Sequence, residues 1–141
     1  MNLFKKMNLF KKSNLKQFYD FVDKIGVDKT QIQEFKEKGF TLVKFGENDL
    51  KNGGILTIVL AFYNDNRRID IFVRKPTQCK NCLETAEKLR NLIRSNNGFQ
   101  FFIEDGIINL VTSIKVNNNI EEALKKMVES KILAETAFQN F

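Results

Sequence analysis

Apolar residues near the start of the chain recur every three or four positions, which is the spacing of an amphipathic helix. This spacing predicts a helix over residues 15–25, ended by a glycine. Asp28 is then expected to cap a short second helix that carries Ile32 and Phe35 and is closed by Gly39. The first part of the fold is therefore predicted to be helical.

The pattern then becomes that of strands. Residues 40–45 form a short candidate strand, and residues 47–54 form a polar loop. Residues 55–63 are the most continuous apolar run and are rich in β-branched side chains. Because both faces of this run are apolar, we place it in the centre of a sheet. A turn at residues 64–66 leads into a further strand over residues 67–74.

A tight hairpin is predicted at Asp105 and Gly106, because both central residues of the favoured hairpin turn adopt positive φ. The hairpin joins apolar strands at residues 99–104 and 107–116. On the second of these strands the alternating residues expected to face the core are Ile108, Leu110, Ile114 and Val116, while Asn109, Ser113 and Lys115 look outward.

Two more helices complete the pattern. The first is predicted over residues 83–93, and its apolar stripe consists of Cys82, Ala86, Leu89 and Ile93. A capping box of Asn119 and Glu122 begins the closing helix. That helix carries the apolar residues Ile120, Leu124, Met127, Val128 and Phe138. The predicted order is α-α-β-β-β-α-β-β-α, an α+β fold with helices packed on a mostly antiparallel five-stranded sheet.

The first twelve residues are a tandem hexapeptide, Met1–Lys6 followed by Met7–Lys12. A period of six residues cannot keep one helical face over a long stretch. We therefore expect a basic extension at residues 1–12, dispensable for folding, and a single domain at residues 13–141. The alternative is a Lys/Phe-rich helix that lies on a membrane surface.

Composition excludes several classes of function. The chain has no histidine, which removes Ser-His and Cys-His nucleophile pairs, histidine metal ligands and the usual general base near neutral pH. Fourteen phenylalanines and no tryptophan favour an apolar core or interface over a polar ligand site. No cofactor is expected. No apolar run is long enough to span a membrane, and we expect a cytoplasmic protein.

Cys79 and Cys82 form the one constellation with the spacing of known chemistry. A thiol in the first turn of a helix is favoured as the thiolate, so the pair is a candidate redox dithiol. Zinc binding is a second interpretation, but without histidine the other two ligands would be carboxylates or come from another chain. In the third interpretation, Cys82 is a small core residue and Cys79 has no special role.

The segment from Ile69 to Leu89 resembles the strand, Cys-x-x-Cys and helix of glutaredoxins. This resemblance implies a thiol-disulfide exchange site at Cys79 and Cys82. The sequence departs from that family downstream, where a second helix crossover and a proline facing the cysteines are required. Here the next strand turns back at residues 105–106, and the only proline, Pro76, precedes the motif.

The element order over residues 14–140 resembles the type III secretion chaperone-like fold, which includes the YbjN family. The resemblance is one of topology and implies a non-enzymatic homodimer that holds another protein through apolar patches. Secretion chaperones tend to be acidic, whereas this chain carries a net charge of +6.

Three functions follow as hypotheses. The first is a non-enzymatic protein-binding or chaperone-like module, a homodimer whose interface uses the sheet or the helix at residues 83–93. The second is a small thiol-disulfide oxidoreductase that uses Cys79 and Cys82. The third is a basic nucleic-acid-binding accessory protein. Its candidate contacts are Lys5, Lys6, Lys11, Lys12 and Lys16, interleaved with Phe4 and Phe10.

Overall fold

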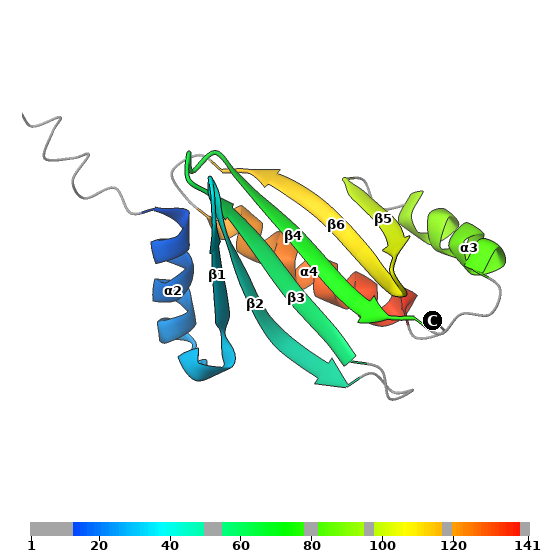
Figure 1. Ribbon diagram of the computed structural model, residues 1–141, viewed down its shortest axis with the longest axis horizontal. Helices are drawn as coiled ribbons and strands as arrows, with labels where there is room; N and C mark the ends of the chain where they lie inside the picture. The colour runs from blue at the N-terminus through cyan, green and yellow to red at the C-terminus, as the bar shows by residue number, and fades with distance from the viewer. Residues whose placement is uncertain (1–12, 50–54, 78–81, 95–97, 117–119, 139–141) are drawn as a thin grey trace, which may run out of the picture.

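The computed structural model describes residues 13–49, 55–77, 82–94, 98–116 and 120–138 (Figure 1). Its helices are α2 (Asn14–Lys24), α3 (Cys82–Arg94) and α4 (Glu121–Ala137), with one 3₁₀ turn, η1 (Lys29–Gln31). Its strands are β1 (Gln33–Glu37), β2 (Phe40–Asp49), β3 (Ile55–Tyr63), β4 (Arg68–Pro76), β5 (Phe99–Glu104) and β6 (Ile107–Lys115). The tandem hexapeptide lies outside the described residues.

The strands form one six-stranded sheet in the order β1-β2-β3-β4-β6-β5, and every neighbouring pair is antiparallel. Figure 1 shows α4 crossing behind the sheet, so the sheet face turned toward the viewer is not covered by that helix. We call the face packed against the helices the helix face and the opposite one the open face.

The hydrophobic core lies between the helix face and the helices. Val43, Leu60 and Ile71 are neighbours across β2, β3 and β4, and each is at most 3% exposed. Phe18 of α2 packs against the same layer, with its ring centroid 5.5 Å from that of Phe62. Apolar burial of this extent is the main stabilising contribution in a domain of this size.

Most of the predicted elements are confirmed. The first helix ends before Gly26, which adopts a φ of +76°. The apolar run at residues 55–63 is β3, with β2 on one side and β4 on the other. The hairpin turn is confirmed too, because Asp105 and Gly106 have φ of +52° and +74°. The class is α+β with an antiparallel sheet, as predicted.

The second predicted helix is wrong, and with it the count of five strands. The Asp28 side chain accepts a hydrogen bond from the Thr30 amide at 2.9 Å, as a cap does, but only the 3₁₀ turn follows. The chain then enters β1, which pairs with β2 through a turn in which Gly39 has a φ of +90°. Ile32 and Phe35 are three residues apart, and pairing with a neighbouring strand outweighed that weak helical signal.

Two boundaries also differ from the prediction. The strand expected to end at Phe45 continues to Asp49 after an irregularity at Gly46, and residues 50–54 of the predicted loop lie outside the description. The residue that caps α4 is Ile120, which makes no side-chain capping hydrogen bond, and Asn119 of the predicted capping box is not described. Val128, one of the apolar residues named for the closing helix, is 51% exposed, whereas Met127 is 9% exposed.

Candidate interaction surfaces

The open face of the sheet carries apolar side chains where an antiparallel sheet usually presents polar ones to water. Strand register places Leu42 beside Ala61, and Val59 beside Phe72, all pointing away from the helices. Val111 of β6 pairs with Phe72 and continues this row. The central strand is therefore apolar on both faces, although only one of them packs against helices.

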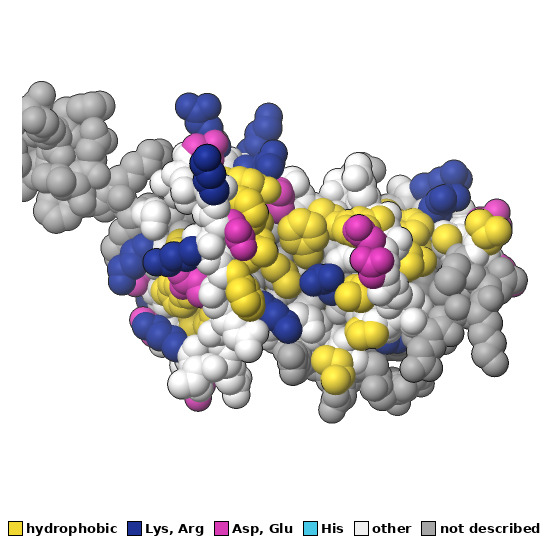
Figure 2. All heavy atoms as spheres, in the orientation of Figure 1, with side chains coloured by type: hydrophobic (Ala, Val, Ile, Leu, Met, Phe, Trp, Pro, Cys, Tyr) yellow, Lys and Arg dark blue, Asp and Glu magenta, His cyan; other side chains and the backbone are white. Residues whose placement is uncertain are grey.

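A groove of about 420 Å³ runs along this face. Its lining comes from five strands and the β5–β6 turn: Leu42, Val59, Phe72, Arg74, Phe102, Glu104, Asp105, Ile107 and Asn109. Figure 2 shows the hydrophobic side chains of this face as a yellow band with a few charged groups among them. Phe102 is 40% exposed and Phe35, farther along the same face, is 48% exposed. We call this set of groove residues the open-face band.

Polar groups within the open-face band are held by internal hydrogen bonds. Arg74 Nε donates to Asn109 Oδ1 at 2.9 Å, and Asn109 is only 3% exposed. Next to the band, Asp70 accepts hydrogen bonds from the hydroxyl groups of Tyr63, at 2.6 Å, and Ser113. These groups already have hydrogen-bond partners within the chain. A second protein that covers the open face would therefore not leave them without a hydrogen bond.

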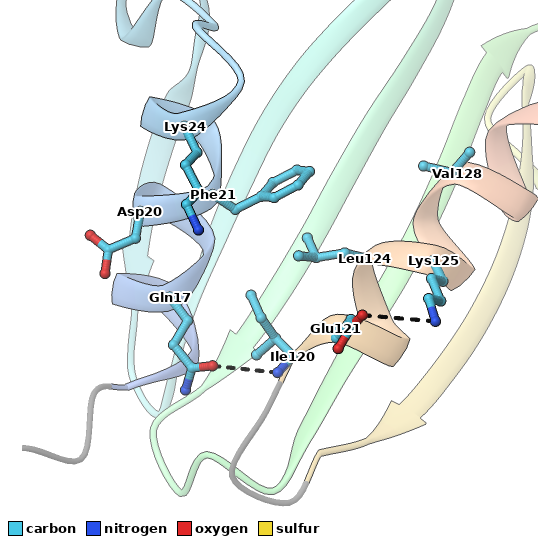
Figure 3. Close-up of a pocket in the computed structure, with 9 residues that line it drawn as sticks. All are labelled: Gln17, Asp20, Phe21, Lys24, Ile120, Glu121, Leu124, Lys125 and Val128. Carbon is cyan, nitrogen blue, oxygen red and sulfur yellow. Dashed lines mark hydrogen bonds and ion pairs between the residues drawn. The ribbon is translucent and has the colours of Figure 1, made fainter.

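A second concave surface lies between α2 and α4 (Figure 3). It has a volume of about 770 Å³, and its lining residues are Gln17, Asp20, Phe21, Lys24, Ile120, Glu121, Leu124, Lys125 and Val128. The helices meet where the Ile120 amide donates to Gln17 Oε1 at 3.4 Å, and Figure 3 shows them separating from there. Its charges include a Lys125–Glu121 ion pair at 3.9 Å. The groove is amphipathic.

The predicted cysteine site is not tested by the structure. Cys79 lies outside the described residues, and Cys82 is the first residue of α3 with a side chain that is not described. The stripe to which it was assigned does face the core at Leu89 and Ile93, which are 2% and 8% exposed. Within the described residues, no three acidic or cysteine side chains converge on a metal-sized site.

Lys75 is a buried cation that the sequence analysis did not identify. Its side chain points to the helix face of β4, where the residue is 4% exposed, and Nζ donates to the Phe138 carbonyl at 2.8 Å. Burial lowers the pKa of this lysine below its ordinary value. Lys75 lies two residues after the buried Val73, and side chains two residues apart on a strand share a face. This alternation could have indicated from the sequence that Lys75 faces the core. Its partner at the end of α4 gives it a structural role.

The open-face band was also missed, since its residues come from five strands whose order in the sheet differs from their order in the sequence. Each strand taken alone shows only one or two outward apolar residues, such as Leu42 or Phe72. Their alignment depends on β6 pairing with β4, across an intervening helix and strand. Among the described residues, no helix is long and apolar enough to cross a membrane.

No known family profile matches the sequence, and no curated protein matches it. The fold is similar to the crystal structure of YbjN from E. coli, which is named as a candidate transcription regulator. The match covers 89% of this chain and 89% of that chain, with a TM-score of 0.60 and 12% sequence identity. The predicted YbjN-like fold is therefore confirmed. The link to type III secretion chaperones stays a prediction.

Proposed function

We propose that this chain is a non-enzymatic protein-binding module that associates with a second copy of itself through the open-face band. The observation that carries this proposal is that Leu42, Val59, Phe72 and Phe102 line one groove on the open face, outside the helix-covered core. Exposed apolar patches of this kind are typical of interaction sites. The fold of YbjN, named as a candidate transcription regulator, supports a binding or regulatory role.

Charge on the open-face band favours a second copy as the partner. The groove contains one cation, Arg74, and two acidic residues, Glu104 and Asp105. In a two-fold interface the same patch meets itself, so Arg74 of one copy can face Glu104 of the other, twice. Such pairing complements charge across the interface and fixes its register.

A charge-swap experiment tests this arrangement. Arg74→Glu alone and Glu104→Arg alone each place like charges opposite one another in a homodimer. Each variant is therefore expected to show the mass of a monomer in light scattering. An equimolar mixture restores opposite charges at both contacts and is expected to return to the dimer mass. Circular dichroism of each variant checks whether it keeps its fold.

The matched control is Glu84→Arg, which makes the same charge reversal on the exposed surface of α3, away from the open face. Its mass should equal that of the wild type. A mixture of the two swapped variants that remains monomeric, or a control that dissociates as they do, would refute the proposed interface.

A further inference from the structure

A row of aromatic and basic side chains crosses the open face at the β3–β4 turn. Strand register places Phe40 beside Tyr63 and Arg68 beside Lys115, and the β3–β4 pairing brings Tyr63 next to Arg68. The Arg68 guanidinium carbon lies 4.4 Å from the centroid of the Tyr63 ring, and the Phe40 and Tyr63 rings are 5.9 Å apart. We call these four residues the tip row.

The cleft at the tip row is lined by three cations and one carboxylate, Asp65. Arg67 joins Arg68 and Lys115 in lining this cleft of about 510 Å³, and all three are exposed. The two carboxylates beside these cations, Asp65 and Asp70, already have partners, and Glu37 lies farther away, next to Phe40. Asp65 accepts from the Arg67 amide at 3.0 Å, and Asp70 contacts Tyr63, Ser113 and Arg68. Figure 2 shows the dark blue Lys and Arg side chains gathered over this end of the sheet.

The start of α2 lies beside this cluster. Asn14, the first residue of α2, donates from its amide to Asn66 Oδ1 at 3.2 Å and from Nδ2 to the Asn66 carbonyl at 3.1 Å. Asn66 precedes Arg67 in the β3–β4 turn. The first residue of α2 is therefore held against the β3–β4 turn, next to the tip row.

We propose that the tip row, together with the neighbouring Arg67, binds single-stranded nucleic acid. Arg67 and Lys115 would hold phosphates, and the outer plane of the Arg68 guanidinium, stacked on Tyr63, would receive an unpaired base. A duplex hides the faces of its bases and could use only the charges. The Asn64–Asn66 turn at this end has no apolar side chain to insert into a membrane and contains an acidic residue, which disfavours an anionic lipid surface. This inference does not depend on self-association.

Fluorescence anisotropy of the full chain with a labelled oligothymidine of about 20 nucleotides tests this site. The double variant Arg67→Gln/Lys115→Gln should bind at least about tenfold more weakly at low salt. The slope of log affinity against log salt concentration should become shallower by about 1.4, as for two lost phosphate contacts. The matched control, Arg90→Gln/Arg94→Gln, removes the same charge from the exposed side of α3 and should change affinity less than about twofold.

Arg68→Lys separates stacking from charge, because lysine keeps the positive charge near Asp70 but has no planar group to stack on a base. The Arg68→Lys variant should bind oligothymidine about threefold more weakly or worse, and the salt dependence of its binding should be unchanged. Equal losses in the two double variants, equally tight binding of a duplex of the same length, or tighter binding to phosphatidylserine vesicles than to the oligonucleotide would each overturn the proposal.

Discussion

Lys75 of β4 and Phe138 at the end of α4 are joined by a 2.8 Å hydrogen bond from Nζ to the backbone carbonyl, with both residues buried. Sixty-three positions separate them in the sequence. The bond attaches the end of the last helix to the end of an interior strand of the sheet, and the cation lies where the negative end of the helix dipole favours it.

Truncating this side chain is expected to destabilise the fold. Lys75→Ala removes the hydrogen bond and leaves a cavity, so the free energy of unfolding should fall by about 2 kcal/mol or more in urea denaturation. Lys115→Ala on β6, where the lysine is exposed, should change it by less than about 0.5 kcal/mol. Equal effects of the two substitutions would show that the Lys75 bond does not contribute to stability.

The stability contributed by Tyr19 is expected to fall at high pH. Burial, together with a 2.6 Å hydrogen bond to Glu34, raises the pKa of this phenol from 10.0 to about 12. Between these values the folded state holds more protons than the unfolded state, so the free energy of unfolding falls as pH rises. Below pH 10 the contribution is fully present.

Tyr19→Phe isolates this effect in urea denaturation across pH 9 to 12. The stability of the wild type relative to the variant should decline as pH rises from about 10. The pKa of Tyr63 is also raised, mainly by its hydrogen bond to Asp70, but this contribution is common to both proteins and cancels in the difference. A difference that stays constant across this range would contradict the assignment.

The β5–β6 turn requires a residue that tolerates positive φ. Gly106 adopts a φ of +74°, so Gly106→Ala should lower the free energy of unfolding by about 1 kcal/mol in urea denaturation. An added Cβ meets no other atom within 4 Å, and the cost should therefore come from backbone strain alone. Asp105→Asn is the control, since asparagine also tolerates this conformation and should be nearly neutral.

The cysteine pair is predicted to be dispensable for association. Replacing both Cys79 and Cys82 with serine should leave the light-scattering mass unchanged. If Cys82 faces the core, burying its hydroxyl should cost about 1–2 kcal/mol of stability. Robust reduction of a model disulfide by the wild type, lost in Cys79→Ser, would instead support the oxidoreductase hypothesis.

Features set by neighbouring residues could be predicted from the sequence. The Asp105–Gly106 turn and the helix ended by Gly26 depend on local conformational preferences, and both are present. The same local logic failed at Phe35, where a three-residue spacing suggested a helix and pairing with β2 produced a strand. Local preference is a weak guide when a sheet edge offers backbone hydrogen bonds.

The candidate surfaces could not be predicted, because they depend on strand order and register. Phe72 and Phe102 reach the same groove only because β6 lies between β4 and β5. Likewise, Tyr63 and Lys115 are far apart in the sequence and share one row only through the pairing of β3, β4 and β6. The residue types favoured a binding protein in the sequence analysis. The places where its candidate surfaces lie could be found only from the fold.

The central claim is that the open-face band is the interface between two copies. Light scattering over a range of concentrations tests it most directly, with Phe72→Lys compared with Val128→Lys in the α2–α4 groove. The account predicts a dimer for the wild type and for Val128→Lys, and a monomer for Phe72→Lys. A wild type that stays monomeric at high concentration, or a dimer broken by the Val128 substitution and not by the Phe72 substitution, would contradict it.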